Sequence, residues 1–85
     1  MNGMWIVYII RCGDNSLYTG ITCNLKKRIE SHLKGGGAKY TRGRGPFELV
    51  HTENYPDRSR ASRREYGLKK LTLKEKLKLI ETKIQ

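Results

Sequence analysis

Apolar residues in the first part of the chain fall into two strand-like runs separated by turn formers. Residues 4–10 are rich in β-branched and aromatic side chains, which favours a strand buried on both faces. Residues 12–16 are typical of a turn, and residues 17–22 form a second short run. We therefore expect a β-hairpin in this part of the chain.

The next segment predicts a helix, a loop and a third strand. Asn24 can cap a helix to about residue 34, because apolar residues recur there at every fourth position (Leu25, Ile29 and Leu33). Glycines at 35–37 end the helix and open a basic, glycine-rich loop that reaches residue 46. Residues 47–52 then alternate apolar and polar side chains, as a half-buried strand does.

Helical signals fill the rest of the chain. Asp57 or Ser59 can cap a second helix to residue 70, and Thr72 with Glu75 has the spacing of a capping box. The residues expected to face inward are Ala61, Leu68 and Leu71 in the second helix, and Leu73, Leu77, Ile80 and Ile84 in the last. This order of elements predicts one α+β domain over residues 1–85, with a small, mostly antiparallel sheet.

The charge balance adds a partner to this picture. The 85 residues contain 18 Lys and Arg against 8 Asp and Glu, a formal net charge of +10. Such an excess repels itself unless a polyanion is near, and nucleic acid is the commonest one. A membrane surface or a ribosomal neighbour are the alternatives that charge alone leaves open.

The cysteines argue against a structural zinc site, and the apolar content argues against a membrane-spanning segment. Cys12 and Cys23 have no CxxC pair or Cys/His cluster around them, so we expect two free thiols in a reducing cytosol and no structural zinc. The apolar run at residues 4–10 is too short to span a membrane and lacks the flanks of a signal peptide. A cytoplasmic location is therefore expected.

Candidate chemistry begins in the hairpin. If its loop is residues 12–16, Ile10 faces Tyr18 and Tyr8 faces Gly20, which puts both tyrosines and the glycine on one face. A glycine within a strand often marks close approach by a ligand or another backbone, so the two phenols can frame a phosphate-sized pocket. The alternative is two core tyrosines with Gly20 at a bulge.

The first two helices add three candidates. Arg28 and His32 are neighbours on one edge of the first helix, where the arginine can grip a phosphate and the histidine can carry a proton. A solvated arginine and a structural histidine are the alternatives. Glu65 lies within the inward stripe of the second helix, where a carboxylate is costly unless compensated. It is either a ligand for Mg²⁺ or a similar ion, or the partner of Lys69 in a surface ion pair.

Basic residues surround these candidates. In the glycine-rich loop, Lys39, Arg42 and Arg44 flank Tyr40. We expect these cations to contact phosphates and the tyrosine ring to stack on an unpaired base, with a merely solvated loop as the alternative. In the second helix, Glu65 is the one acid among Arg58, Arg60, Arg63 and Arg64.

Taken in order, these motifs resemble the GIY-YIG nuclease superfamily. Its two signature elements correspond to Ile6-Val7-Tyr8 and Tyr18-Thr19-Gly20, followed by an arginine, a histidine and a glutamate at Arg28, His32 and Glu65. The resemblance covers nearly the whole chain. It is closest to the short stand-alone bacterial members, through residues 14–22, 37–42, 65–66 and 69–72.

The resemblance implies a three-stranded antiparallel sheet flanked by helices, with the site on one face of the sheet. It implies a structure-selective endonuclease that hydrolyses phosphodiester bonds in DNA, with RNA as the alternative, and serves DNA repair or recombination. A monomer is expected, although the sequence does not show the oligomeric state. Glu65 would hold one divalent ion, Mg²⁺ or Mn²⁺, and Arg28 would neutralise charge on the phosphoryl oxygens. Tyr8, Tyr18 or His32 would position or deprotonate the attacking water. Nucleic acid would also contact Gly20 and Arg64.

Two departures from the family pattern support a different interpretation. Ile6 replaces the glycine of the first signature, and no asparagine follows Glu65. The alternative is therefore a nucleic-acid-binding module of the same fold with weak or no catalysis. A protein-interaction surface on the last helix is a third interpretation, although its leucine and isoleucine stripe is more simply explained by packing on its own core.

Overall fold

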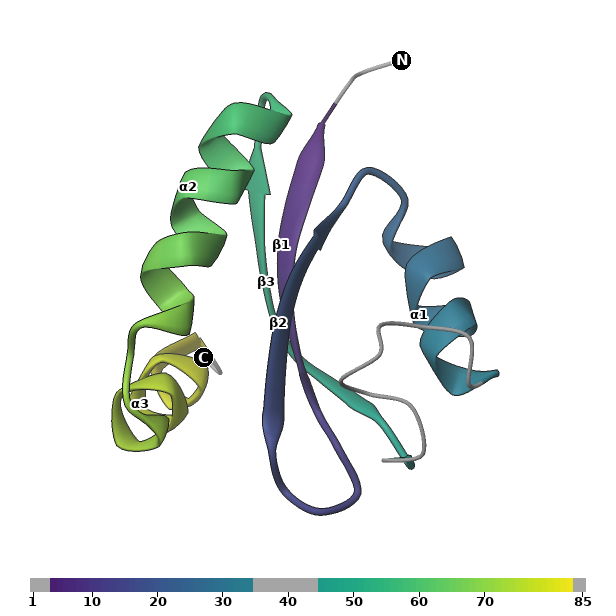
Figure 1. Ribbon diagram of the computed structural model, residues 1–85, viewed down its shortest axis with the longest axis vertical. Helices are drawn as coiled ribbons and strands as arrows, with labels where there is room; N and C mark the ends of the chain where they lie inside the picture. The colour runs from purple at the N-terminus through teal and green to yellow at the C-terminus, as the bar shows by residue number, and fades with distance from the viewer. Residues whose placement is uncertain (1–3, 35–44, 84–85) are drawn as a thin grey trace.

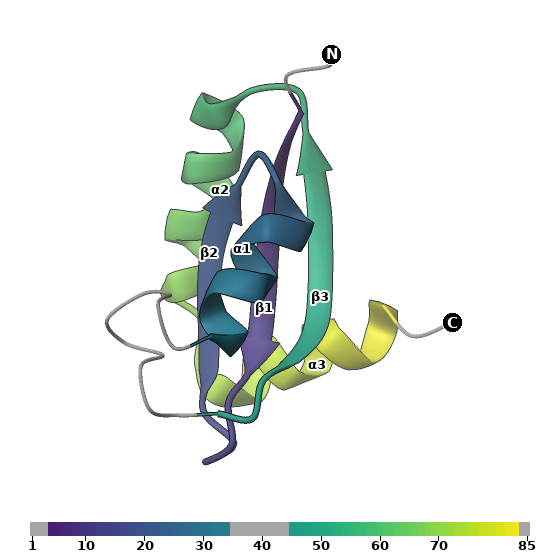
Figure 2. The ribbon, with the colours of Figure 1, turned by 90° about the vertical axis from the view of Figure 1, so that its right-hand side faces the viewer.

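The computed structural model describes residues 4–34 and 45–83, which form a three-stranded sheet between helices (Figure 1). The strands are β1 (Trp5–Arg11), β2 (Leu17–Thr22) and β3 (Glu48–Tyr55), and the helices are α1 (Leu25–Leu33), α2 (Arg58–Lys69) and α3 (Leu73–Lys83). Helix α1 covers one face of the sheet, and α2 and α3 cover the other (Figures 1 and 2). The predicted α+β fold and element order are confirmed.

Strand β1 is the centre of the sheet, with β2 and β3 antiparallel on either side. Its residues Val7, Tyr8, Ile9 and Ile10 are completely buried, as predicted for a strand covered on both faces. The hairpin register is also the predicted one, since Ile10 pairs with Tyr18 and Tyr8 with Gly20. Strand β3 continues beyond the predicted end at residue 52.

Side chains cap the helices as the sequence predicts. Asn24 accepts a hydrogen bond of 3.1 Å from a backbone N–H in the first turn of α1, and Asp57 does the same for α2 at 2.8 Å. Thr72 and Glu75 form the reciprocal capping box at 2.9 and 3.1 Å. These caps fix where each helix begins and therefore which residues of α1 and α2 reach the sheet.

The hydrophobic core lies between the sheet and the pair α2 and α3. Alternate residues of β1 and β2 point to this side, and their partners come from the two helices. The buried members are Val7, Ile9, Leu17, Ala61, Leu68 and Ile80. On the opposite face, Tyr8 contacts residues of α1, so polar aromatic side chains take the place of an aliphatic core there.

Two predicted helix stripes are partly wrong. In α1, Leu25 and Ile29 are partly buried, but Leu33 is 60% exposed and His32 is buried in its place, because the imidazole lies against Tyr8. In α3, Leu73 and Leu77 are exposed and Ile80 is the buried residue. Ile84 lies outside the described residues.

Both cysteines are free thiols, Cys12 buried and Cys23 exposed, as expected. Within residues 4–34 and 45–83, none of the helices has the length and apolar character needed to cross a membrane.

Candidate active site

Tyr8 on β1 and Tyr18 on β2 lie together on the face of the sheet that α1 covers, with ring centroids 6.3 Å apart. A Cβ added to Gly20 would lie 2.7 Å from the Tyr8 phenol oxygen and 3.0 Å from the Tyr18 ring. The pairing of β1 with β2 is regular at this point, so Gly20 does not sit at a bulge. The glycine makes room for the tyrosine side chains themselves, and its contact with nucleic acid stays a prediction.

Helix α1 adds His32 and Arg28 to the two tyrosines. The Nε2 atom of His32 lies 3.0 Å from the Tyr8 phenol oxygen, and the imidazole packs edge-on against both tyrosine rings. One helical turn earlier, Arg28 Nε donates a hydrogen bond of 3.2 Å to the same phenol oxygen. Four of the five predicted catalytic residues therefore form one connected group, here called the tyrosine cluster (Tyr8, Tyr18, Arg28 and His32).

Burial and the Arg28 charge set the protonation states in the tyrosine cluster. Burial raises the pKa of Tyr8 above its ordinary value, and the hydrogen bond from Arg28 only partly opposes this. Burial also lowers the pKa of His32, and the positive charge of Arg28 lowers it further. At neutral pH the phenol therefore keeps its proton and the imidazole is neutral. Tyr8 can then donate to Nε2 of His32 when the imidazole proton is on Nδ1.

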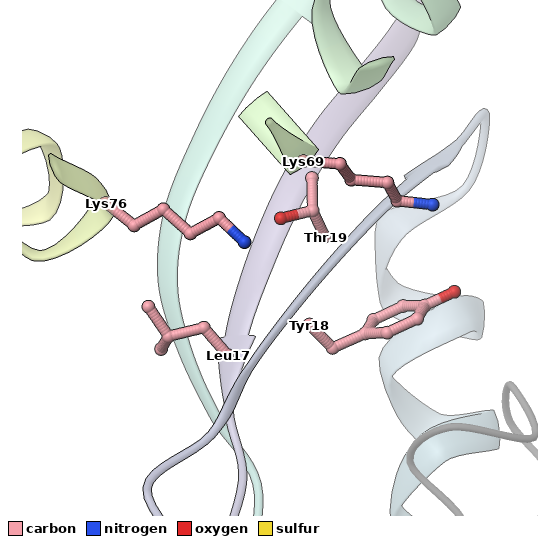
Figure 3. A pocket seen from close by; sticks show the side chains of 5 residues that line it. All are labelled: Leu17, Tyr18, Thr19, Lys69 and Lys76. Carbon is pink, nitrogen blue, oxygen red and sulfur yellow. The ribbon is translucent and has the colours of Figure 1, made fainter. Parts of the chain in front are cut away.

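Glu65 approaches the tyrosine cluster from α2, on the other side of the sheet. Its carboxylate lies 3.1 Å from Lys69 Nζ, the ion pair that the sequence offered as the alternative to a metal ligand. The carboxylate is also close enough for its charge to contribute to the raised pKa of Tyr8. Because β2 is an edge strand, side chains of α2 can reach past it, and Figure 3 shows Lys69 extending across β2 on the side of Tyr18.

A divalent ion at this site would depend mainly on Glu65. The described part of the chain contains no group of three or more His, Cys, Asp or Glu side chains that could hold a metal ion together. Mg²⁺ is commonly held by one or two carboxylates, while waters and substrate phosphates complete its shell. A single carboxylate with a 21% exposed side chain fits such an ion, whereas a structural zinc site needs four protein ligands. The metal role of Glu65 stays a prediction.

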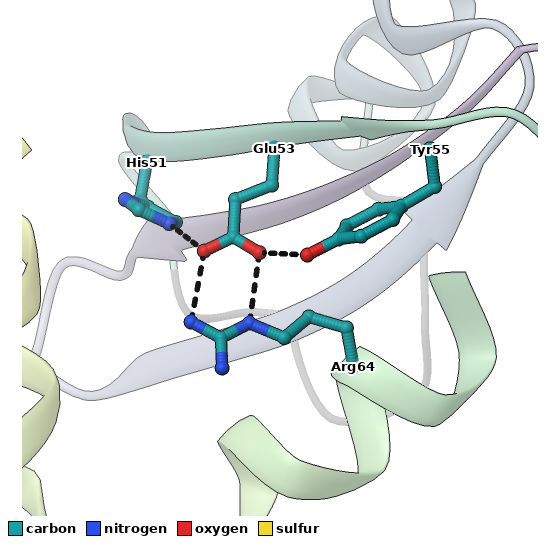
Figure 4. Close-up of polar contacts among 4 residues, drawn as sticks. All are labelled: His51, Glu53, Tyr55 and Arg64. Carbon is teal, nitrogen blue, oxygen red and sulfur yellow. Dashed lines mark hydrogen bonds and ion pairs between the residues drawn. The ribbon is translucent and has the colours of Figure 1, made fainter. Parts of the chain in front are cut away.

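A second polar cluster lies between β3 and α2 and was not predicted. Glu53 accepts hydrogen bonds from Arg64 at 2.8 and 3.1 Å and from the Tyr55 hydroxyl at 2.7 Å, and it pairs with His51 Nε2 at 2.8 Å (Figure 4). Burial alone would raise the pKa of Glu53, but the bonds from Arg64, His51 and Tyr55 lower it to about 2. The signal in the sequence was the spacing of His51, Glu53 and Tyr55, which places them on one face of a strand. It was missed because the predicted strand stopped at residue 52.

The predicted nucleic-acid contacts remain predictions. Arg64 is held by Glu53 in a bidentate pair, with its side chain 40% exposed. The loop residues Lys39, Tyr40, Arg42 and Arg44 lie outside the described residues.

A three-stranded antiparallel sheet that brings the tyrosines of two signature motifs against a helical arginine is the arrangement expected of a GIY-YIG domain. Residues 4–78 match the family of the GIY-YIG catalytic domain. The chain therefore belongs to the GIY-YIG family.

Its relatives include small proteins that align over most of their length. The chain is 57% identical over 77 residues to the UPF0213 protein CPE1444 of Clostridium perfringens, covering 91% of this chain and 83% of the relative. It is 53% identical over 81 residues to the UPF0213 protein OB0043 of Oceanobacillus iheyensis, covering 95% and 94%.

Solved structures agree with the fold. The solution NMR structure of the UPF0213 protein BH0048 from Bacillus halodurans is similar with a TM-score of 0.62 and 48% identity, over 94% of this chain and 85% of that one. The NMR structure of the protein EF2693 from E. faecalis has a TM-score of 0.64 and 38% identity, over 93% and 84%. These similarities confirm the predicted family and fold class.

Proposed function

We propose that this protein is a metal-dependent, structure-selective endonuclease that hydrolyses phosphodiester bonds in DNA, and that it serves repair or recombination in the cytoplasm. Membership of the GIY-YIG family suggests nuclease activity. The observation that carries the proposal is the tyrosine cluster, in which one buried phenol joins a guanidinium to an imidazole. The charge of Glu65 acts on the same phenol.

Arg28 is proposed to neutralise charge that develops on the phosphoryl oxygens. A guanidinium carries five N–H donors. Nε donates to Tyr8 and a further hydrogen bond goes to Tyr18, so donors are still left for a phosphate. A donor fixed in advance stabilises the transition state without having to reorganise. Tyr8 is completely buried, and we therefore assign it the role of a positioning residue that holds Arg28.

Tyr18 is proposed to position or deprotonate the attacking water, with His32 behind it. Tyr18 is only partly buried, unlike Tyr8, so its hydroxyl is the tyrosine group that can reach a water. Its ring lies 5.5 Å from that of His32, whose lowered pKa keeps the imidazole neutral. Because His32 is 1% exposed and its Nε2 atom is hydrogen-bonded to Tyr8, we propose that the imidazole positions the tyrosines and does not contact the water itself. Tyr8 is a poorer base because burial raises its pKa.

Glu65 is proposed to hold the divalent ion. When bound, this ion would polarise the scissile phosphate and stabilise the leaving oxygen. The competing partner is Lys69, whose side chain is 52% exposed. Ion pairs with so much access to water contribute little free energy, so a divalent cation can displace the lysine.

The variant Glu65→Gln tests the proposal. We expect it to lose cleavage of branched, flapped or single-stranded DNA in Mg²⁺ or Mn²⁺, because the amide binds a hard cation poorly. Binding of the same DNA without metal, and the melting temperature, are expected to stay unchanged. Glu81→Gln removes an equal charge from an exposed position of α3 and is the matched control. Undiminished cleavage by purified Glu65→Gln would point to a contaminating nuclease.

A nucleic-acid-binding module without catalysis is the second candidate. The observation that favours it is the Glu65–Lys69 ion pair, which already compensates the carboxylate without a metal. It predicts that the wild-type protein binds DNA in a salt-sensitive way, yet leaves every substrate uncut in the presence of Mg²⁺ or Mn²⁺.

A further inference from the structure

We propose that a pocket on the α2–α3 side of β2 is a second phosphate-binding site, which holds a backbone phosphate of the nucleic acid bound at the tyrosine cluster. The Thr19 pocket is lined by Leu17, Tyr18, Thr19, Lys69 and Lys76. The identity of its ligand as a nucleic-acid strand rests on the proposed function, whereas the affinity for phosphate does not.

Three elements build the Thr19 pocket from residues far apart in the sequence. Strand β2 provides Thr19, α2 provides Lys69 and α3 provides Lys76. In Figure 3 the Lys76 side chain points toward Thr19, whereas Lys69 extends across β2 and its ammonium group ends on the side of Tyr18. The volume is about 350 Å³, near the lower end of the range typical of small-molecule sites.

The Thr19 hydroxyl is the observation that points to a ligand. Thr19 is 3% exposed, and its Oγ1 atom has no hydrogen-bond partner among the described residues. Buried polar groups are nearly always paired, so an exception needs a partner that comes from outside the chain. In Figure 3 this oxygen points into the pocket, toward the side from which Lys76 enters.

The charge of the pocket identifies the class of ligand. Lys76 has no ion-pair partner in the part of the chain that the structure describes. The ion-pair partner of Lys69 there is Glu65. The Lys76 ammonium group and the Thr19 hydroxyl lie on the same side of β2, and the Lys69 ammonium group can join them by turning back from Glu65. A phosphate, with its negative charge and its acceptor oxygens, satisfies all three groups, and lysine is a common phosphate ligand.

The location of the pocket connects it with the tyrosine cluster. Tyr18 belongs to the cluster and also lines the pocket, and the next residue along β2 is Thr19, which points to the opposite face. A strand of nucleic acid that crosses the edge of the sheet at β2 therefore meets Tyr18 on one side and the Thr19 pocket on the other. Its successive phosphates supply a ligand for each.

Lys69 couples the two sites, because it is both a wall of the pocket and the partner of Glu65. A phosphate in the pocket competes with the Glu65 carboxylate for the same ammonium group. Its binding would draw Lys69 away and leave the carboxylate available for a cation. We infer that bound nucleic acid in this way favours metal binding at Glu65.

Titration of the ¹⁵N-labelled full chain with inorganic phosphate at constant ionic strength tests the pocket. We expect saturable shifts at the amides of Thr19, Lys69 and Lys76, and the same shifts with a short single-stranded oligonucleotide. Lys76→Gln should weaken both affinities by about tenfold, as for a lost charge-assisted hydrogen bond. The matched control is Lys78→Gln, which removes the same charge from an exposed position of α3 and should leave both affinities nearly unchanged.

Equal affinities in Lys76→Gln and Lys78→Gln would overturn the site. Shifts with phosphate but none with the oligonucleotide would overturn its assignment to a nucleic-acid strand.

Thr19→Val separates a ligand contact from a structural role. Because Oγ1 makes no hydrogen bond within the described residues, we expect the melting temperature not to fall, while phosphate affinity falls several-fold. A lower melting temperature with unchanged phosphate affinity would show that a buried water satisfies the hydroxyl, and the proposal would fail.

Glu65→Gln makes the two proposals separable. We expect it to bind phosphate at least as tightly as the wild type, because Lys69 loses its competing partner. If the wild-type protein cuts no DNA, but Lys76→Gln still binds phosphate more weakly than Lys78→Gln, only the nuclease proposal fails. Cleavage lost in Glu65→Gln, with no difference between the two lysine variants, would end only the phosphate site.

Discussion

The contact between Gly20 and Tyr8 shows how a single position can organise the candidate site. The phenol of Tyr8 passes so close to β2 that any side chain at Gly20 would meet it. Because the phenol oxygen is bonded to both His32 and Arg28, the absence of a Cβ at Gly20 helps to place two further side chains. The two signature motifs are thus linked by packing as well as by chemistry.

Substitution of Gly20 by alanine should destabilise the protein and disturb the tyrosine cluster. The new Cβ would lie 2.7 Å from the Tyr8 oxygen and 2.8 Å from Cζ, and the completely buried ring has little room to move. We expect a loss of about 1–3 kcal/mol in the free energy of unfolding, as for other overpacked cores. Urea denaturation measures it, and NMR signals of His32 report the disturbance.

Gly67→Ala is the control for this prediction. A Cβ at Gly67 meets nothing within 4 Å, and the residue lies in α2. There alanine should stabilise the helix by about 0.5–1 kcal/mol. A Gly20→Ala protein as stable as the Gly67→Ala protein would contradict the close approach of Tyr8.

Most of the candidate site was predictable at the residue scale, and the exception is instructive. The hairpin register placed Tyr8, Tyr18 and Gly20 together because a turn of known length fixes which residues face each other. The position of Arg28 followed from its helical spacing to His32. Burial of His32 in place of Leu33 was not predictable, because it depends on how α1 rotates against the tyrosine rings.

At the scale of elements, α2 connects the two edges of the sheet. Through Arg64 it is bonded to Glu53 on the edge strand β3, and through Glu65 and Lys69 it extends toward the other edge strand, β2. The Arg64–Glu53 pair is more buried than the Lys69–Glu65 pair, since the Glu53 side chain is 16% exposed and that of Glu65 is 21% exposed. We expect this bonded pair to hold the orientation of α2, and with it the position of Glu65.

The hydrogen bonds that Glu53 accepts from Arg64 and Tyr55 predict a specific loss of stability in acid. The pKa of Glu53 is lowered to about 2 in the folded protein from an ordinary value of 4.5. A lowered pKa contributes stability that is complete above pH 4.5 and disappears as the pH falls from 4.5 toward 2, amounting to at most about 3 kcal/mol. Urea midpoints measured between pH 2 and pH 7 should show this slope.

Glu53→Gln should flatten the slope and lower stability at pH 7, because Arg64 loses its charged partner. Glu48→Gln, at a position whose side chain is 67% exposed, should keep the acid slope. Parallel pH profiles for wild type and Glu53→Gln would show that the acid sensitivity has another origin.

At the scale of the whole molecule, a net charge of +10 on 85 residues dominates any encounter with a polyanion. The acidic residues with the firmest ion pairs in the described chain are neutralised locally, Glu53 by Arg64 and Glu65 by Lys69. The excess of lysine and arginine is therefore left to act on partners. Binding driven by such an excess releases counterions from nucleic acid and weakens as salt rises.

Salt dependence should report how many of these cations contact phosphates. For duplex DNA, the plot of log affinity against log salt should be linear, with a slope of about −0.9 for each phosphate contact. Replacing Lys39, Arg42 and Arg44 by glutamine should make the slope shallower by up to about three such contacts. Fluorescence anisotropy over a salt series measures it.

Replacing the exposed Lys74 and Lys78 on α3 by glutamine should change the slope less than the loop substitutions do, because neither of these lysines lines the Thr19 pocket. Equal slopes for the wild type and the loop variant would exclude the loop from the binding surface.

The sequence by itself determined the features that depend on neighbours along the chain. Strand and helix periodicity, the Asn24 cap, the Thr72–Glu75 capping box and the hairpin register all follow from local sterics and hydrogen bonding, which act over a few residues. The same local rules narrowed the cap of α2 to Asp57 or Ser59. Only the tertiary structure decided which face α1 presents, that Glu53 is bonded to Arg64, and that Lys69 and Lys76 line one pocket with Thr19. These depend on packing between segments remote in sequence, and periodicity leaves the rotation and approach of packed helices open.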